Sequence, residues 1–399
     1  MKLCYVATDV RIPYYSGSAT HVMEVSKELT RLGNTVFVVI RLDHPRQKRL
    51  EEIEGIKIFR MPRLPISYAS RDLASKKRHD IPSSFLERLY RFYLGFIHIF
   101  YATAFVLHLI RKYDIEVVME RGSSLGCGTF AGLLTGSPVV LELNDPVYNR
   151  LSLRIARKIV TTSKKLIPAR FRNKAKLVTW GVNTAMFNPK VSGDKIRKRF
   201  GIEDRQIVLF VGSFAGWHGL DDLIQASKIV LNEKPDVKFL IVGGGKKHPN
   251  YRHVIEEVKN LNLTKNFIFA GTVDYQEIPK FIAASDVTAA PYNPKRSEYL
   301  RKYGFFYSPL KIFEYMAVGK PIVASRIENI SDIIEDGVTG LLFDAGDTEA
   351  LAQAIVKLLD SKSLAKRLGR NAYLDSRNYS WQRHCKMLND LLEELTRER

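Results

Sequence analysis

The feature that most constrains this chain is a pattern that opens each half: a short apolar segment, a loop with glycine, and an amphipathic helix. In the first half residues 3–7 are apolar, and Gly17 lies in the loop before a helix that we expect Thr20 to cap. In the second half residues 207–211 are apolar, and the loop 212–219 contains three glycines ahead of the helix. Short apolar runs are typical of buried parallel strands. The pattern predicts an α/β fold of two Rossmann-like domains, which bind ligands at the carboxyl ends of their strands.

Length and charge narrow the class of protein. A chain of 399 residues is longer than one hydrophobic core usually serves, and its 45% hydrophobic and 26% charged residues are typical of globular proteins. Lys and Arg number 62 against 42 Asp and Glu, and the net charge of +20 favours nucleic acid, an anionic membrane surface or phosphorylated small molecules. Lys and Arg do not cluster with interleaved aromatic residues, so we do not expect nucleic acid as a partner. A polyanion-binding protein stays open as an alternative.

The cysteines and the start of the chain indicate a compartment. Cys4, Cys127 and Cys385 are far apart in the sequence and form no C-x-x-C motif, so we expect neither a disulfide framework nor a zinc site. A reducing cytoplasm fits this usage. Met1 and Lys2 lead directly into the first apolar segment, and we expect no signal peptide.

Residues 89–110 are the most apolar segment of the chain. A membrane-spanning helix needs about 20 mainly apolar residues, and Arg91, His98 and His108 interrupt this one. We therefore expect a buried helix of the first domain. An interfacial helix that helps to seat the protein on a membrane is the alternative, supported by the aromatic residues and the basic cluster 75–78. A true membrane span is the third interpretation.

Residues 303–325 predict a loop, a helix and a strand. Ser308 is a favourable N-cap, Pro309 suits the first helical position, and Gly319 is a favourable C-terminal stop after a helix over residues 310–318. The unpaired N–H groups at the start of such a helix favour an anion.

Two charged side chains of this helix point to a nucleotide. Lys311 lies in the first turn, where a cation opposes the helix dipole unless it has a negative partner such as a phosphate. Glu314 lies one turn further, where its carboxylate can accept hydrogen bonds from a ribose diol. The alternative is an ordinary buried helix with Lys311 in solvent.

The same residues carry a family resemblance. Residues 308–325, SPLKIFEYMAVGKPIVAS, resemble the donor-site segment of the retaining glycosyltransferases of family 4, which have the GT-B fold. That family has an E-x7-E motif here, and its second Glu, which holds the nucleotide ribose, corresponds to Glu314. The first Glu corresponds to Phe306, so that carboxylate is absent, and the chain is similar to a subgroup with an S-P-L-K variant. The resemblance extends along nearly the whole chain and implies two Rossmann-like domains facing across a cleft.

The resemblance also implies how the loops serve the donor. The glycine-bearing loop of the first domain lies close to the donor diphosphate in the family. The loop that begins at Gly212 supplies an Arg and a Lys to the diphosphate in many members, and Ser213 and His218 occupy those positions here. We expect a protonated His218 to replace part of that charge, with its pKa raised by a neighbouring phosphate. The nucleobase of the family lies against the turn that corresponds to residues 271–273.

These considerations define the predicted site. Lys311, Glu314 and His218 are the predicted catalytic residues, and no bound metal or other cofactor is expected besides a UDP- or GDP-linked sugar as co-substrate. The predicted donor-binding residues are Gly17, Ser18, Gly212, Ser213, Gly271, Thr272, Val273, Ser308, Pro309, Leu310, Lys311 and Glu314.

Four residues of the first half are assigned to the acceptor. Glu120 and Arg121 follow the predicted strand 115–119, and Asn144 and Asp145 end the next one, so both pairs lie at carboxyl ends of strands. The family often has a His near this cleft, and we find no clear counterpart. An internal ion pair between Glu120 and Arg121 is the alternative interpretation.

The domain boundary also comes from the resemblance. Residues 178–189, VTWGVNTAMFNP, resemble the linker entry N-G-V-D-x-x-x-F-x-P of the family. We therefore expect an acceptor-side domain over 1–183 and a nucleotide-sugar-binding domain over 184–379, with the last helix, within 380–399, packing back on the first domain.

The resulting hypothesis is a retaining, metal-independent glycosyltransferase of hexosyltransferase type. It takes a sugar from a nucleotide sugar and gives it to a glycan or lipid-linked acceptor in glycan, polysaccharide or glycolipid biosynthesis. The basic charge and segment 89–110 predict peripheral contact with an anionic membrane at the cytoplasmic face. The alternative is a non-catalytic relative that binds a sugar nucleotide or a partner enzyme, because family donor-site charges are missing at Ser213, His218 and Phe306.

Overall fold

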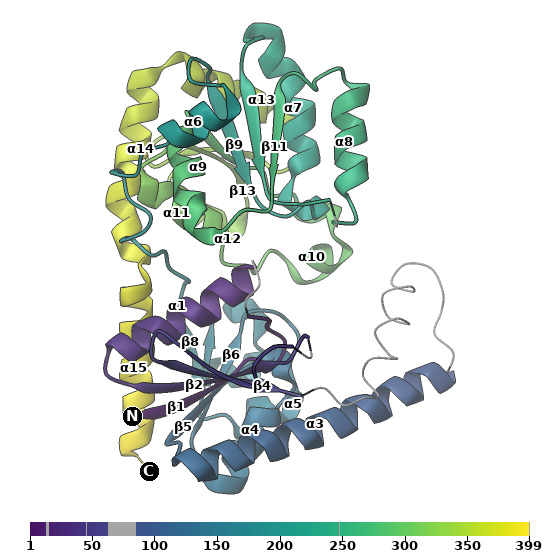
Figure 1. Ribbon diagram of the computed structural model, residues 1–399, viewed down its shortest axis with the longest axis vertical. Coiled ribbons are helices and arrows are strands. Elements are labelled where there is room, and N and C mark those ends of the chain that lie inside the picture. Colours follow the sequence, from purple (N-terminus) through teal and green to yellow (C-terminus); the bar gives the residue numbers. More distant parts are fainter. Residues whose placement is uncertain (13–15, 45, 63–84, 247, 399) are drawn as a thin grey trace. The chain divides into compact units, whose positions relative to one another are not determined.

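The structure, a computed structural model, describes residues 1–399 except 13–15, 45, 63–84, 247 and 399, and gives only the backbone of residues 85–96 and 98. The chain forms two compact units (Figure 1). One consists of Met1–Thr179 with His384–Arg399, and the other of Trp180–Arg383. The structure divides the chain between Thr179 and Trp180, a few residues before the boundary that we expected after residue 183.

The first unit is built on an eight-stranded sheet with the order β3-β4-β2-β1-β5-β6-β7-β8. All neighbours are parallel except the antiparallel pair β3 and β4. The β3–β4 hairpin was not foreseen, because its strands are short and half polar. The strands are β1 (Lys2–Val6), β2 (Thr35–Arg41), β3 (Leu50–Ile53), β4 (Ile56–Met61), β5 (Val117–Arg121), β6 (Val139–Leu143), β7 (Lys158–Thr161) and β8 (Ala175–Leu177).

Helices cover both sides of this sheet (Figure 1). On one side α3 (Phe85–Tyr113), α4 (Cys127–Thr135) and α5 (Arg150–Ile155) bury apolar side chains in one core with the strands, together with the 3-10 segments η2 (Lys164–Leu166) and η3 (Ala169–Lys174). On the other side lie α1 (Gly17–Arg31) and α15 (Trp381–Arg397), which belongs to this unit from His384 onward. Asn34 Nδ2 donates to Asn389 Oδ1 (2.7 Å), which ties α15 to the unit.

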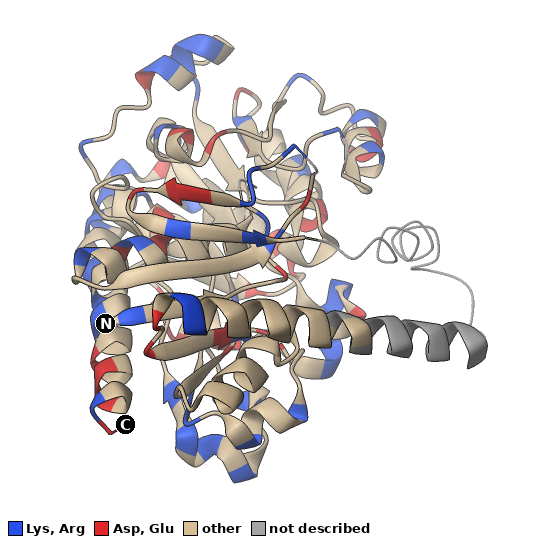
Figure 2. Cartoon of the chain, turned by 60° about the horizontal axis from the view of Figure 1, so that its bottom comes forward, with Lys and Arg blue, Asp and Glu red and all other residues tan. Residues whose placement is uncertain are grey.

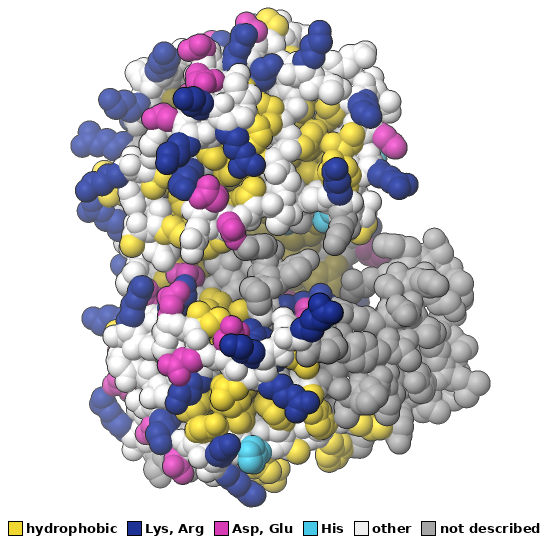
Figure 3. Space-filling view, viewed as in Figure 1, with side chains coloured by type: hydrophobic (Ala, Val, Ile, Leu, Met, Phe, Trp, Pro, Cys, Tyr) yellow, Lys and Arg dark blue, Asp and Glu magenta, His cyan; other side chains and the backbone are white. Residues whose placement is uncertain are grey.

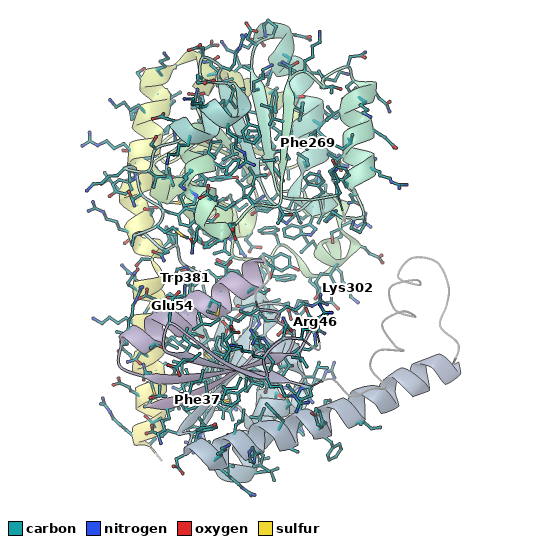
Figure 4. The ribbon with its side chains drawn as sticks, viewed as in Figure 1. Phe37, Arg46, Glu54, Phe269, Lys302 and Trp381 are labelled. Atoms are coloured by element: carbon teal, nitrogen blue, oxygen red, sulfur yellow. The ribbon has the colours of Figure 1, made fainter. Side chains whose placement is uncertain are left out.

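Aromatic side chains complete the core of the first unit. The ring of Phe37 lies 6.3 Å from that of Phe59 and 5.0 Å from that of Tyr113, centroid to centroid (Figure 4). Phe37 is 2% exposed, so β2, β4 and the end of α3 close around it.

The second unit has a six-stranded, all-parallel sheet with the order β11-β10-β9-β12-β13-β14. Its strands are almost wholly apolar because helices lie on both faces, as expected of a doubly wound sheet. The strands are β9 (Ile207–Val211), β10 (Lys238–Val242), β11 (Phe267–Gly271), β12 (Val287–Ala290), β13 (Ile322–Arg326) and β14 (Leu341–Asp344).

The helices of the second unit follow its strands in turn (Figure 1). They are α6 (Asp194–Phe200), α7 (Leu220–Glu233), α8 (Tyr251–Asn260), α9 (Ile278–Ala284), α10 (Glu298–Tyr303), α11 (Leu310–Val318), α12 (Glu328–Ser331), α13 (Thr348–Asp360) and α14 (Lys362–Ser376). Short 3-10 segments are η4 (Gly216–His218), η5 (Tyr275–Glu277), η6 (Pro294–Arg296) and η7 (Arg377–Tyr379). The predicted fold class, two Rossmann-like α/β domains, is confirmed.

Two predicted helix caps are wrong. Ser16, not Thr20, caps α1, because Ser16 has extended backbone and its Oγ accepts from the N–H of Ala19 (3.2 Å). The predicted loop residues Gly17 and Ser18 therefore form the first turn of α1. At α11 the cap position is Pro309, without a side-chain hydrogen bond, while Ser308 Oγ accepts from the backbone N–H of Trp180 (3.3 Å).

The apolar segment 89–110 lies within α3. Ala102, Val106 and Leu109 are buried against the sheet, as expected of a core helix. Among the described residues, no helix has the length and apolar character needed to cross a bilayer. The basic cluster 75–78 lies outside the described residues.

Candidate functional site

The loops at the carboxyl edge of the second sheet meet through their backbones. Gly212, directly after β9, donates its N–H to Val242 O (2.9 Å), and Gly243, directly after β10, donates to Gly271 O (2.8 Å). Gly243 has a φ of +114°, and a Cβ on it would lie 2.1 Å from the carbonyl oxygen of Gly212. The structure therefore brings together the glycines after β9 and at the end of β11, as the sequence predicted for a shared ligand edge.

Lys311 lies in the same place, in the first turn of α11. Its side chain is 7% exposed, and its Nζ lies 3.2 Å from Nδ1 of His218, which follows β9 in η4. The ammonium also lies over two aromatic rings, 4.4 Å from the centroid of Phe210 and 4.7 Å from that of Tyr292. The interpretation of Lys311 as a solvated surface residue is therefore wrong.

Burial changes the protonation of this pair. Desolvation lowers the pKa of Lys311 to about 7, while the carboxylate of Glu314 acts in the opposite direction. Desolvation and the positive charge of Lys311 hold the pKa of His218 well below its usual value. Without a phosphate beside it, His218 is thus disfavoured as a cation, and its protonation next to a donor phosphate stays a prediction. A neutral His218 accepts a hydrogen bond from Lys311 through Nδ1.

Glu314 is buried one turn further along α11. Its side chain is 4% exposed, and desolvation raises its pKa to about 7, against the opposing effects of a hydrogen bond from Tyr275 and the charge of Lys311. The pKa values of Lys311 and Glu314 are thus both about 7, so each group changes protonation near neutral pH. Such shifts are more frequent in functional sites than elsewhere.

The remaining predicted donor residues of the second unit border this edge. Ser213 is exposed, with its Oγ 3.4 Å from the N–H of Ala215, and Thr272 is exposed in the turn after β11. Val273, Leu310 and Ser308 are half-buried, and Pro309 is buried.

Phe306, which the resemblance aligns with the family's first Glu, is buried among aromatic rings. It is 1% exposed, and its ring lies 4.4 Å from that of Tyr307. Tyr307 in turn stacks on Trp217, with centroids 5.0 Å apart and planes at 18°. Aromatic packing therefore stands where a carboxylate would otherwise project.

The sequence did not single out three residues that complete the surroundings of Lys311 and Glu314. Phe210 and Tyr292 lie beneath the ammonium of Lys311, and the hydroxyl of Tyr275 acts to lower the pKa of Glu314. Tyr292 follows β12, and Tyr275 lies shortly after β11. Their positions near the carboxyl ends of strands are the sequence signal that could have identified them as site residues.

In the first unit the predicted donor residues Gly17 and Ser18 begin α1. Gly17 is exposed and Ser18 is half-buried. In this first turn Ser16 accepts from the N–H groups of Ala19 and Thr20, at the helix end that favours anions.

Glu120, predicted on the acceptor side, has a structural role. It is fully buried, and its carboxylate accepts from the N–H groups of Gly126 (3.0 Å), Gly128 (3.1 Å) and Thr129 (2.8 Å) and from the hydroxyl of Thr129. A carboxylate enclosed in this way is not available to an acceptor, so that assignment is wrong. The alternative, an ion pair with Arg121, is also wrong, because Glu120 binds the start of α4 instead.

Arg121 pairs with other carboxylates. Its Nε lies 3.5 Å from Asp9 Oδ1, and its Nη1 lies 3.5 Å from Glu142 Oε2. Glu142 also accepts from the hydroxyl of Tyr5 (2.5 Å) and lies 3.2 Å from Nε2 of His21. Arg121 is 4% exposed and is thus fixed in a buried polar network at the carboxyl ends of β1, β5 and β6.

Asn144 and Asp145 lie at the same edge, directly after β6. Both are half-buried, and Nδ2 of Asn144 is buried without a hydrogen-bond partner among the described residues. Asp145 Oδ1 accepts from the N–H of Val147 (3.0 Å), and desolvation raises the pKa of the Asp145 carboxyl. Of the four predicted acceptor residues, these two are partly exposed, whereas Glu120 and Arg121 are buried.

One group of described residues has the spacing of metal ligands. Ligand atoms of Asp221, His253 and Glu257 lie within 4.8 Å of one another. These groups already form ion pairs, since His253 Nε2 is 3.7 Å from Asp221 and 3.6 Å from Glu257, and Arg296 is 3.4 Å from Asp221. Arg296 thus supplies a cation to Asp221, and we assign no metal to this group.

Comparison with known proteins identifies the class of enzyme. The model of the family "Glycosyl transferases group 1" matches residues 192–375, within the second unit. The chain is 29% identical to alpha-D-kanosaminyltransferase of Streptomyces kanamyceticus over 178 residues, which cover 45% of this chain and only 42% of that protein. It is 24% identical to an uncharacterised glycosyltransferase of Methanocaldococcus jannaschii over 418 residues, 96% of each chain.

Solved structures agree with the fold. Sucrose-phosphate synthase of Thermosynechococcus elongatus superimposes with a TM-score of 0.75 at 19% identity over the whole of both chains. The chain is a glycosyltransferase of the GT-B fold. Anabaena HepE in complex with UDP-glucose is similar to this glycosyltransferase with a TM-score of 0.73 at 17% identity, over 99% of this chain and 100% of that one.

Proposed function

We propose that this glycosyltransferase moves a sugar, with retention of anomeric configuration, from a nucleotide sugar bound at Lys311 and Glu314 to an acceptor presented by the first unit. The observation that supports it most is the buried ammonium of Lys311, held 3.2 Å from His218 at the start of α11. A buried cation is costly without a negative partner. A diphosphate at this edge supplies that partner.

The chemistry follows from where charge develops. The bond that breaks joins the anomeric carbon to a diphosphate oxygen, and the bond that forms joins that carbon to an acceptor hydroxyl oxygen, whose proton passes to the departing diphosphate. Negative charge grows on the diphosphate as it leaves. Lys311 and the positive end of the α11 dipole are suited to stabilise that charge. Glu314 is suited to hold the ribose hydroxyls and so to orient the nucleotide.

The nucleotide and the acceptor are proposed by class. A UDP- or GDP-linked sugar fits the donor residues, and the similarity to HepE with bound UDP-glucose favours UDP. No metal is required for the proposed mechanism, because Lys311 supplies the cation. For the acceptor we propose a glycan or a lipid-linked molecule at the cytoplasmic face of a membrane, since a net charge of +20 favours an anionic surface.

A thermal-shift screen with UDP, GDP, ADP and their common sugar conjugates tests the donor site. A ligand that binds only the folded state raises the melting temperature, and the rise increases with the logarithm of the ratio of ligand concentration to dissociation constant. We expect a shift with one nucleotide class, lost in Lys311→Met and Glu314→Gln. Lys357→Met and Glu349→Gln make the same chemical changes at exposed positions of the same unit and should keep the shift.

The same screen separates the proposal from its alternative. Phe306 leaves no carboxylate at the family's first Glu position, which is the observation in favour of a non-catalytic relative. Binding of a nucleotide sugar without release of nucleotide in the presence of acceptors would support that relative. No shift with any nucleotide would refute the donor site itself.

A further inference from the structure

One stretch of the first unit is strongly basic and free of acidic residues. Residues 146–179 contain ten Lys and Arg and no Asp or Glu. Two of the cations are paired with α15, Arg157 with Glu398 (4.0 Å) and Lys158 with Glu394 (3.5 Å). A positive charge concentrated in this way points to a negatively charged partner.

The fold places this stretch on the side of the sheet that α3 and α4 cover. Leu153 of α5 and Phe171 of η3 bury their side chains in the same core as Val106 of α3 and Ala131 of α4. Lys174 Nζ donates to the carbonyl oxygens of Arg154 (2.9 Å) and Ala156 (2.8 Å), which fixes the end of η3 against the end of α5. The elements α3, α4, α5 and η3 thus share one core on this side of the sheet.

The outer surface of this layer carries apolar side chains as well as cations. Four large hydrophobic residues on α3, α4 and α5 are exposed: Phe100 (61%), Leu133 (58%), Leu134 (64%) and Leu151 (46%). The described part of α3 has Lys and Arg only near its C-terminal end (Figure 2), and the space-filling view shows hydrophobic side chains along α3 among Lys and Arg (Figure 3). Exposed hydrophobic residues that gather on one face mark an interaction site more often than isolated ones do.

We call this surface the basic–apolar face. Its apolar members are the four residues above, and its exposed cations are Arg111, Lys112, Arg150, Arg154, Arg170 and Arg172. Among the described residues no carboxylate forms an ion pair with Arg150, Arg154, Arg170 or Arg172. The acidic residues closest in sequence have partners elsewhere: Asp114 lies 3.8 Å from Lys2 Nζ, Glu116 accepts from the N–H of Lys2, and Asp145 accepts from the N–H of Val147.

We infer that the basic–apolar face seats this glycosyltransferase on an anionic lipid bilayer. Each Lys or Arg near an anionic membrane surface contributes about 1 kcal/mol. Leucine and phenylalanine side chains gain further free energy when they enter the boundary between headgroups and acyl chains. Nucleic acid and other polyanions satisfy the arginines equally well, but they leave Leu133, Leu134 and Phe100 in water. A bilayer satisfies both kinds of side chain.

This inference deepens the proposed function, since it names the surface that would carry the enzyme to a membrane-bound acceptor. The membrane contact that we expected of segment 89–110 and its basic neighbours is here assigned to a different surface. In α3 the buried side chains Val106 and Leu109 face the sheet, and the contact includes α4, α5 and η3.

Co-sedimentation of the full chain with vesicles tests the inference. The probes are phosphatidylcholine vesicles with and without about one third phosphatidylglycerol. Arg150→Glu with Arg154→Glu reverses two charges of the face, and Leu133→Ser with Leu134→Ser removes two apolar contacts. Lys195→Glu with Lys198→Glu makes the same charge change on exposed residues of α6 in the second unit.

We expect the wild type to bind the anionic vesicles and not the neutral ones. The arginine variant should lose about tenfold or more in partition coefficient, the leucine variant several-fold, and the α6 variant less than twofold. Circular dichroism and thermal unfolding confirm that each variant is folded.

Three results would overturn the inference. The first is that the wild type does not bind anionic vesicles. The second is that the α6 variant loses as much vesicle binding as the arginine variant. The third is that the wild type binds a single-stranded oligonucleotide but no vesicles, and that the arginine variant loses this oligonucleotide binding. The nucleotide shift, measured on the same variants without vesicles, is independent of this face. Failure of the membrane inference and failure of the donor site therefore give different results.

Discussion

The ammonium of Lys311 lies 3.2 Å from Nδ1 of His218, although 93 residues separate the two in the chain. The lysine lies on α11 and the histidine lies in the loop after β9. The ends of both side chains lie beside Gly212. Desolvation and the charge of Lys311 hold the pKa of His218 well below its usual value, which favours a neutral imidazole beside the lysine. We propose that this one buried charge serves the diphosphate in place of the Arg and Lys that the family resemblance leads one to expect.

Replacement of Lys311 by Met should separate binding from stability. Loss of a charge-assisted hydrogen bond to phosphate costs about 1.5–3 kcal/mol, so we expect nucleotide affinity to fall about 10- to 100-fold by titration calorimetry. Thermal stability at pH 7 should stay unchanged or rise, because the desolvation of a buried ammonium disappears. Lys357→Met, on the exposed face of α13, should alter neither quantity. A large loss of stability in Lys311→Met would instead indicate that the lysine is a structural residue.

The pKa of Lys311 also predicts how stability depends on pH. In the folded protein it is lowered to about 7 from the ordinary 10.5, so between these values the unfolded chain binds a proton that the folded chain lacks. The contribution of this group to the free energy of unfolding therefore rises with pH over that window. Chemical denaturation of wild type and Lys311→Met at pH 7 and pH 9 measures it. The expected result is a smaller rise in the variant, and equal rises in both proteins would contradict it.

Affinity for the nucleotide sugar should pass through a maximum near pH 7. As pH rises through about 7, Lys311 loses its proton and its attraction for the diphosphate. As pH falls through about 7, Glu314 takes up a proton and accepts ribose hydroxyls less well. In Glu314→Gln only the alkaline loss should remain, and in Lys311→Met only the acidic loss. A flat profile in the wild type between pH 5.5 and 8.5 would disprove the roles assigned to both residues.

Substitution of Gly212 by Ala should weaken nucleotide binding without unfolding the protein. A Cβ at this position would lie 2.8 Å from both Lys311 Nζ and His218 Nδ1, so the ends of these side chains must move. We expect a loss of affinity of about tenfold, comparable to the loss of one well-placed hydrogen bond. Gly216→Ala, where the nearest neighbouring atom is 3.6 Å away, is the control within the same loop. Equal affinities of the two variants would show that the diphosphate does not use this contact.

Glu120→Gln should damage stability and spare the donor site. The buried carboxylate accepts four hydrogen bonds from Gly126, Gly128 and Thr129, and an amide nitrogen in place of one oxygen cannot accept. The expected loss is about 2–4 kcal/mol in the unfolding of the first unit, seen as a lower melting temperature. The temperature shift produced by nucleotide should be retained. A variant as stable as the wild type that loses transfer activity would restore the acceptor role predicted from sequence.

Periodicity and helix-stop chemistry predicted much of the fold. The helix Leu310–Val318 with its stop at Gly319 and the strand Ile207–Val211 were predicted with the bounds that the structure has. The β3–β4 hairpin and α5 were missed, because they are short and carry no strong apolar period. Ser308 was misplaced as a cap because its hydroxyl binds the backbone of Trp180, a contact across 128 residues that no local pattern contains.

In the candidate site, too, some features follow from local sequence and others from tertiary packing. The sequence by itself determined that Gly212, Lys311 and Glu314 lie at carboxyl ends or helix starts beside one ligand edge, since strand and helix periods act over a few residues. Only the tertiary structure decided the protonation of His218, the aromatic floor under Lys311 and the burial of Glu120. Protonation and burial depend on neighbours from distant segments, and desolvation in that packed environment outweighs the intrinsic pKa that a residue brings from its sequence.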